Sequence, residues 1–227
     1  MNKSQNKICS VCSNEIDKKY CSKCGQYFTN KRITSGSVLN DLFNSIFSLE
    51  KSFFKNMKIG LTQPEKLILN YWKGYRGFYY SPGKFFTIGS LLLLLHYLFA
   101  NDFLGIIVTS TISSQFVILL FNIFLLTFLS YLVYFKQKKN FHEHLVLNIY
   151  NVSIWTIIFV PISIMLNAFV GDNFIEQAFF LPYHLLIIIW NSKVFEISRL
   201  KRFSFVSLNL ILFYGIIFLL IFTFGEF

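Results

Sequence analysis

Hydrophobic positions follow two regimes along this chain. Before residue 85 they alternate with charged and polar residues, whereas the rest of the chain is dominated by Leu, Ile, Phe and Val with brief polar interruptions. A helix needs roughly 20 predominantly apolar residues to cross a bilayer core of about 30 Å. Five stretches meet or approach this length and predict five membrane-spanning helices, at residues 85–100, 116–135, 145–169, 174–190 and 203–224.

The fourth stretch permits a second topology. Glu176 lies at its start and Pro182 within it, so a re-entrant or strongly kinked segment, and a protein of four spans, is the alternative. Pro161 predicts a kink in the third stretch, because its ring removes one backbone hydrogen bond.

The segment before the first span has its own helical signals. Apolar residues recur in steps of three and four over residues 38–57, which predicts an amphipathic helix that lies in the headgroup region or packs on the ends of the spans. The run Thr62-Gln63-Pro64-Glu65 predicts a capping box, with Pro in the first turn of a short helix that ends near Trp72. An aromatic, basic turn at 74–82 follows.

Charge then gives an orientation. The chain has 227 residues, of which 54% are hydrophobic and only 14% charged, against about 25% charged in a soluble domain. Fourteen of its 21 Lys and Arg precede residue 85, three lie at 136–139 and four at 193–202. Five spans place all of them on one side. The positive-inside rule, together with an N-terminal stretch that lacks a signal-peptide pattern, predicts a bacterial inner-membrane protein with its N-terminus in the cytoplasm and its C-terminus outside.

All four cysteines form one C-x2-C-x8-C-x2-C pattern near the N-terminus. Two C-x-x-C knuckles can direct four thiolates at one tetrahedral ion, and disulfides are unexpected in a cytoplasmic segment. The pattern predicts a miniature zinc ribbon in which the closed shell makes the metal structural; a single iron and a redox-active dithiol are the alternatives. The predicted ligands are Cys9, Cys12, Cys21 and Cys24.

These signals divide the chain into a ribbon at 1–33, an amphipathic juxtamembrane segment at 34–84 and a transmembrane domain at 85–227. Basic residues of the first two parts are candidates for binding a protein, nucleic acid or anionic lipid. The alternative is a solubilising face beside a negatively charged leaflet. The candidates are Lys18, Lys19, Lys23, Lys31, Arg32 and Arg76.

Polar residues in or near the spans form a second group of candidates. We interpret them as helix-packing groups, with a hydrated path or a proton site as the alternative. The predicted spans have no central Asp, Glu, Lys or Arg, which disfavours an ion-coupled transporter. Residues two apart do not share a helix face, which weakens a joint site at 142 and 144. The group comprises His96, His142, His144, Asn148, Asn151 and His184.

Several of these motifs resemble an uncharacterised bacterial membrane family, domain of unknown function 3667. The resemblance rests on the knuckle Tyr20-Cys21-Ser22-Lys23-Cys24-Gly25-Gln26 and on the turn from Tyr71 to Pro82, which is similar to Y-x-x-G-x-R-x-x-Y-x-x-P. Phe141-His142-Glu143-His144-Leu145 resembles a further feature of that family. The resemblance covers about residues 9–145 and implies no activity.

Taken together, the sequence predicts an all-α polytopic membrane protein that acts as an anchored accessory or scaffold, not as an enzyme. Its ribbon and basic juxtamembrane surface would recruit a protein or a protein–nucleic-acid complex at an anionic leaflet. The alternative is an oligomeric pore-forming effector, for example an accessory of an RNA-targeting CRISPR or other defence system.

Overall fold

The computed structural model describes most of the chain and is mainly helical. Most of the expected amphipathic helix at 38–57 and the basic candidates Lys18 and Lys31 lie outside the described residues. Residues 35–38 form a single helical turn. The described ranges are 7–16, 19–29, 32–38, 53–76, 78–99, 102–104, 106–107, 113–169 and 173–224.

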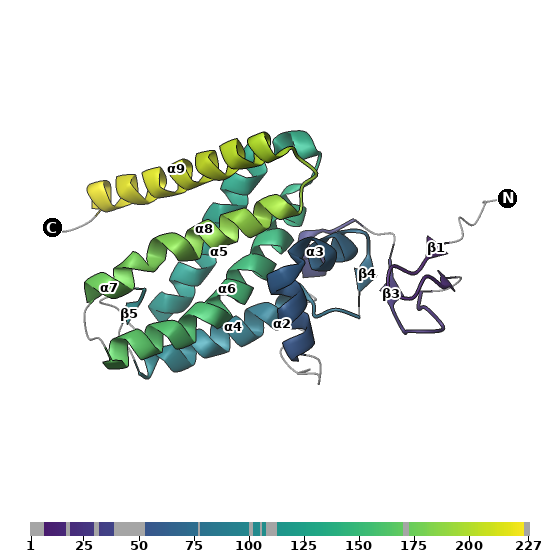
Figure 1. Cartoon of the computed structure of the whole chain (residues 1–227), viewed down its shortest axis with the longest axis horizontal. Coiled ribbons are helices and arrows are strands. Elements are labelled where there is room, and N and C mark those ends of the chain that lie inside the picture. Colours follow the sequence, from purple (N-terminus) through teal and green to yellow (C-terminus); the bar gives the residue numbers. More distant parts are fainter. Residues whose placement is uncertain are drawn as a thin grey trace.

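Five helices lie side by side and form the body of the molecule (Figure 1). They are α4 (Pro82–Tyr97), α5 (Ser113–Val133), α6 (Phe141–Phe169), α8 (Phe180–Lys193) and α9 (Arg199–Phe224). Shorter elements lie at the two ends of this bundle: α2 (Phe53–Thr62), α3 (Pro64–Trp72), the 3-10 turn η1 (Phe135–Gln137), α7 (Asn173–Ala178) and the hairpin of β5 (Asp102–Phe103) and β6 (Ile106–Ile107).

Among the residues that the structure describes, three helices are long and apolar enough to cross a membrane, which indicates a membrane protein. They contain the segments Phe116–Val133, Phe141–Phe169 and Arg199–Leu220. The first and fourth predicted spans also form helices, but α4 has 16 residues and α8 has 14, fewer than the roughly 20 that a straight crossing needs. The helical nature of all five stretches is therefore confirmed, and the number of spans stays a prediction.

The fourth stretch is interrupted, as its proline suggested. Helix α7 ends at Ala178, Phe179 forms a turn and α8 begins at Phe180, so Pro182 lies in the first turn of α8. A proline ring clashes with the carbonyl group four residues earlier, which here belongs to Ala178. The break thus falls where a continuous helix would be most strained.

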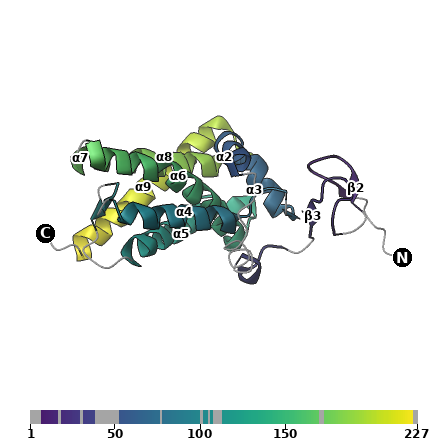
Figure 2. The ribbon, with the colours of Figure 1, turned by 90° about the horizontal axis from the view of Figure 1, so that it is seen from below.

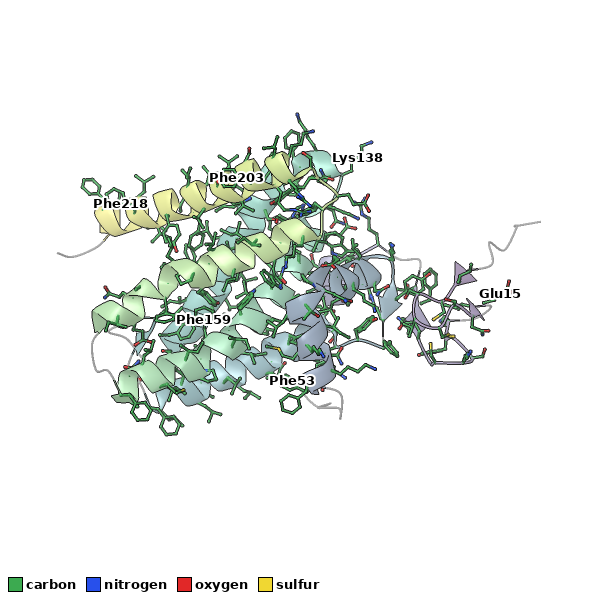
Figure 3. All side chains as sticks on the ribbon, viewed as in Figure 1. Glu15, Phe53, Lys138, Phe159, Phe203 and Phe218 are labelled. Atoms are coloured by element: carbon green, nitrogen blue, oxygen red, sulfur yellow. The ribbon has the colours of Figure 1, made fainter. Side chains whose placement is uncertain are left out.

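Helix α6 occupies the centre and packs against α4, α5 and α8. The α4 contact is close at Gly89, where an added Cβ would lie 3.4 Å from the carbonyl oxygen of Ser153. Small residues at such positions let membrane helices approach one another. By contrast, the outer faces of α5 and α9 carry exposed apolar side chains. Phe203 and Phe218 project away from α9 (Figure 3) and are 74% and 68% exposed.

The predicted capping box at Thr62 is wrong, although the helix that it announced is present. Thr62 is the last residue of α2, and its hydroxyl donates to the carbonyl of Lys58 at 2.8 Å. Gln63 occupies the N-cap position of α3 without a side-chain cap bond, and Pro64 is the first helical residue. The two helices adjoin so closely that the threonine belongs to the preceding turn.

Candidate functional site

The four cysteine sulfurs converge on one point at the N-terminal end of the molecule. Their Sγ atoms all lie within 4.8 Å of one another, with Cys9 and Cys24 3.5 Å apart and Cys12 and Cys21 3.4 Å apart. A tetrahedral ion with metal–sulfur bonds of about 2.3 Å requires sulfur–sulfur distances of roughly 3.8 Å. The arrangement therefore fits a metal ion, and it would supply all four ligands of a tetrahedral site.

The two knuckles are built alike. The N–H of Ser13 donates to the carbonyl of Cys9 at 3.0 Å, and the N–H of Gly25 donates to that of Cys21 at 2.9 Å. Each donor follows the second cysteine of its pair and has a left-handed backbone, with φ of 57° at Ser13 and 71° at Gly25. A serine and a glycine thus take the same left-handed conformation in the two knuckles.

The thiols of the cluster differ in acidity. The backbone N–H of Cys24 lowers the pKa of Cys21 to about 6, whereas burial raises the pKa of Cys24 to about 12. Thiolates are the forms that bind metal, so a metal ion would have to displace protons from the less acidic thiols. Cys21 would therefore lose its proton more readily than Cys24 when a metal binds.

A small apolar core surrounds the cluster. Strands β1 (Lys7–Ile8) and β2 (Glu15–Ile16) pair antiparallel, and Ile16 is buried beside Cys9 and Cys21. This core is separate from the core of the helical bundle. A module of this size buries too little apolar surface to fold unaided, which is the usual situation in which a metal supplies folding energy.

The module, residues 7–29, is joined to the bundle by a second small sheet. Strand β3 (Tyr27–Phe28) pairs antiparallel with β4 (Tyr75–Arg76), which lies between α3 and α4. Next to this pair, the side chain of Gln26 donates to the carbonyl of Arg76 at 3.1 Å, and the hydroxyl of Tyr75 donates to that of Ile8 at 2.9 Å. The module therefore projects from the end of the bundle while β4 holds its base (Figure 2).

Residues 32–38 make a further attachment, at the start of α6. Arg32 forms an ion pair of 3.1 Å with Glu143, whose carboxylate also accepts the N–H of Asn140 at 2.7 Å. The hydroxyl of Ser35 lies 2.6 Å from Nε2 of His142. Residues 141–145 therefore bind the segment that follows the module. The sequence did not predict this contact.

The four basic candidates within the described ranges lie in different surroundings. Lys19 and Lys23 are exposed on the module. Arg32 faces α6, and Arg76 is half-buried with its guanidinium carbon 4.7 Å from the ring centre of Tyr71.

The polar candidates of the spans pair across helices. Asn191 of α8 accepts a hydrogen bond from Asn151 and donates one to Asn148, each at 2.7 Å. His142 and His144 point to different partners, because Nδ1 of the buried His144 lies 2.8 Å from the hydroxyl of Ser130 in α5. Helix packing accounts for these contacts, as the sequence interpretation preferred.

A polar cluster at the opposite end of the bundle was missed from the sequence. Glu176 of α7 is only 2% exposed and accepts hydrogen bonds from Ser163, Asn167 and the backbone N–H of Leu104. Nε2 of His96 lies 2.8 Å from the same Ser163 hydroxyl. Glu176 thereby connects α7 to α6 and to the β5–β6 hairpin, and its position beside a predicted span end gave no sign of this burial.

His184 is buried in α8 between two hydrogen-bonding partners. Its Nε2 lies 2.9 Å from Nδ2 of Asn122, and its Nδ1 lies 2.9 Å from the carbonyl of Phe180. The pair links α8 to α5. This histidine thus has the packed environment that the sequence interpretation expected.

Comparison with known proteins adds no relative: no family model, curated protein or solved structure matches the chain.

Proposed function

We propose that the chain is a membrane-anchored adaptor, in which a zinc-bound four-cysteine module recruits a cytoplasmic protein partner to the bacterial inner membrane. The observation that carries this proposal is a cluster of four cysteine sulfurs in a module that stands clear of the bundle but is fixed to it by β3 and β4 (Figure 1). Four thiolates leave no open coordination position, and catalytic metals need one. The metal would accordingly shape a surface and would not act on a substrate.

The surface of the module has the composition of a docking site. Ile8 and Tyr20 are 62% and 63% exposed, although both side chains are large enough to bury considerable area. Lys19 and Lys23 are exposed in the same module. Aromatic and apolar anchors rimmed by charge are typical of protein–protein contacts, and the lysines would favour an acidic partner.

The distribution of charge supports the proposed orientation. The loop that contains Lys138 lies at the end of the bundle from which the module projects, whereas α7 and the C-terminus lie at the other end (Figures 1 and 3). Lys193 and Arg199 flank the connection between α8 and α9 at the module's end. Excess Lys and Arg mark cytoplasmic loops, so the module would face the cytoplasm.

Kinship with the uncharacterised family stays part of the proposal. Its basis is the sequence of the motifs alone, and three of their residues, Gly74, Tyr75 and Arg76, lie at the junction with the module.

Affinity purification from membranes tests the adaptor. Tagged wild type and a Cys9→Ser/Cys12→Ser variant would be compared at equal abundance in the membrane fraction, with Ser10→Ala as an exposed control in the same knuckle. We expect the wild type and the control to retain a common protein partner and the double variant to lose it. Retention of that partner by the double variant would contradict the proposal.

A further inference from the structure

A cavity of about 120 Å³ lies beneath β4, between α3, the start of α4 and α6. One water needs only about 10–15 Å³ of such space, so the cavity can hold a small polyatomic group. Six polar or aromatic residues line most of its wall: Tyr71, Tyr75, Arg76, Tyr79, Ser81 and Tyr150.

Arg76 is the charged group of this wall. Its Nε is buried without a hydrogen-bond partner, and its guanidinium lies over the ring of Tyr71. Within the part of the chain that the structure describes, the only ion pairs join Glu143 to Arg32 and Lys139. Arg76 therefore has no carboxylate partner there. A buried donor without an acceptor is costly in a folded protein, and the positive charge of the guanidinium favours an anion as that acceptor.

The start of α4 adds to this positive character. Ser81 is the N-cap of this 16-residue helix, with its hydroxyl oxygen accepting the N–H of Lys84 at 3.3 Å. The N-terminus of a helix carries partial positive charge and favours anions. The hydroxyls of Tyr75 and Tyr150 instead donate to the carbonyls of Ile8 and Tyr80, so these rings shape the cavity and Arg76 supplies its cationic donor.

We propose that this cavity binds a phosphate group through Arg76, with the N-terminal end of α4 adding partial positive charge nearby. The planar fork of arginine matches the spacing of phosphate oxygens better than a lysine ammonium does. The residues that line the cavity come in part from α3 and β4, which lie at the same end of the bundle as the module (Figure 1) and as Lys138 (Figure 3). The phosphate would belong either to a lipid headgroup at that membrane surface or to a soluble phosphate compound. This inference does not depend on the adaptor function.

Inorganic phosphate is the first probe. Calorimetric titration of the purified full-length protein in detergent would compare wild type, Arg76→Gln and the control Lys73→Gln, which removes a neighbouring exposed charge outside the cavity wall. We expect binding by wild type and Lys73→Gln, and at least about tenfold weaker binding by Arg76→Gln, as for loss of a charge-assisted hydrogen bond. Equal weakening in both variants would overturn the site, because it would indicate a diffuse basic surface.

A lipid probe distinguishes a lipid headgroup from a soluble compound as the source of the phosphate. Nanodiscs of phosphatidylcholine with and without phosphatidic acid, whose headgroup is a bare phosphate, would be analysed by native mass spectrometry. Retention of phosphatidic acid by wild type and not by Arg76→Gln supports the site and assigns it to lipid. Binding of inorganic phosphate without lipid retention supports it with a soluble ligand. Failure of wild type to bind either probe would overturn the proposal.

Two further measurements test the site even if Arg76→Gln does not fold. Arg76→Lys keeps the charge and loses the fork, so we expect phosphate affinity between those of wild type and Arg76→Gln. In addition, phosphate should raise the Tm of the wild type above its value in chloride at equal ionic strength, because a ligand of the native state stabilises it. The absence of any such rise at saturating phosphate would contradict the proposal without recourse to a variant.

Discussion

Gly74 and Thr29 approach so closely that no side chain fits between them. Gly74 has φ of 87°, and a Cβ built on it would lie 1.9 Å from the carbonyl oxygen of Thr29. The N–H of Thr29 in turn donates to the carbonyl of Gly74 at 3.0 Å. This contact extends the pairing of β3 with β4 and holds the base of the four-cysteine module against the bundle.

Gly74→Ala should release the module from the bundle. The substituted residue would need a left-handed backbone, which costs an L-residue about 1–2 kcal/mol, and would collide with backbone that cannot yield. Hydrogen exchange is the measurement, with faster exchange expected in the segments of β3 and β4 and unchanged exchange in α6. Gly36→Ala is the matched control, because an added Cβ there meets nothing within 4 Å. Equal protection of β3 and β4 in both variants would contradict this role of Gly74.

The junction also marks the limit of what the sequence predicts. Helix formation in the five apolar stretches depends on local composition and length, so it could be predicted. The convergence of the four cysteine sulfurs depends on local spacing and could be predicted as well. Strands β3 and β4 have two residues each and lie about fifty positions apart, so neither has a periodicity that a pattern could detect. The sequence accordingly indicated only an aromatic, basic turn at 74–82, and not half of a sheet.

The hydrogen-bond partners of buried polar residues could not be predicted from the sequence for a similar reason. Asn148 and Asn151 could be predicted as interhelical hydrogen-bonding groups, but their shared partner Asn191 could not, because nothing local aligns α8 with α6. The sequence placed Glu176 only at the start of the fourth apolar stretch. Its burial arises from the chain break at Phe179, which lets α7 pack its carboxylate against Ser163.

Metal removal should unfold the module alone. We expect about one zinc ion per chain in purified protein, and a strong chelator should abolish amide protection over residues 7–29 while the helical circular dichroism persists. The reason is that the core around Cys9, Ile16 and Cys21 is separate from that of the bundle. Readdition of zinc should restore protection. Protection that survives complete metal loss would show that the cysteines fold the module without an ion.

Replacing Glu143 should destabilise the protein more than replacing its ion-pair partner Arg32. The Arg32 side chain is 62% exposed, so Arg32→Gln should cost no more than about 1 kcal/mol. Glu143→Ala should cost more, because Glu143 also accepts the N–H of Asn140 at the start of α6 and loss of such a cap costs about 1 kcal/mol by itself. Thermal unfolding in nanodiscs measures both. Equal destabilisation would indicate that the ion pair, and not the cap, dominates.

Glu176→Ala should be among the most destabilising single substitutions at the end of the bundle far from the module. It would remove one acceptor from Ser163, Asn167 and the N–H of Leu104. Ser163 and Asn167 keep other partners, but the buried N–H of Leu104 would lose its acceptor, which costs about 1–3 kcal/mol. Ile175→Ala is the matched control, since the neighbouring Ile175 is 42% exposed. The unfolding temperature in nanodiscs should fall well below that of wild type for Glu176→Ala only. A loss no larger than that of Ile175→Ala would contradict the account of this cluster.

Site-specific photocrosslinking from position 20 tests the adaptor most directly, because Tyr20 is exposed on the module and is not a metal ligand. A photoreactive amino acid would replace Tyr20 in membrane-inserted protein in living cells, in the wild-type background and with Cys9→Ser/Cys12→Ser. The account predicts a discrete crosslinked protein partner in the first background and its loss in the second, at equal membrane abundance. The same crosslinked partner in both backgrounds, or none in the first, would contradict it.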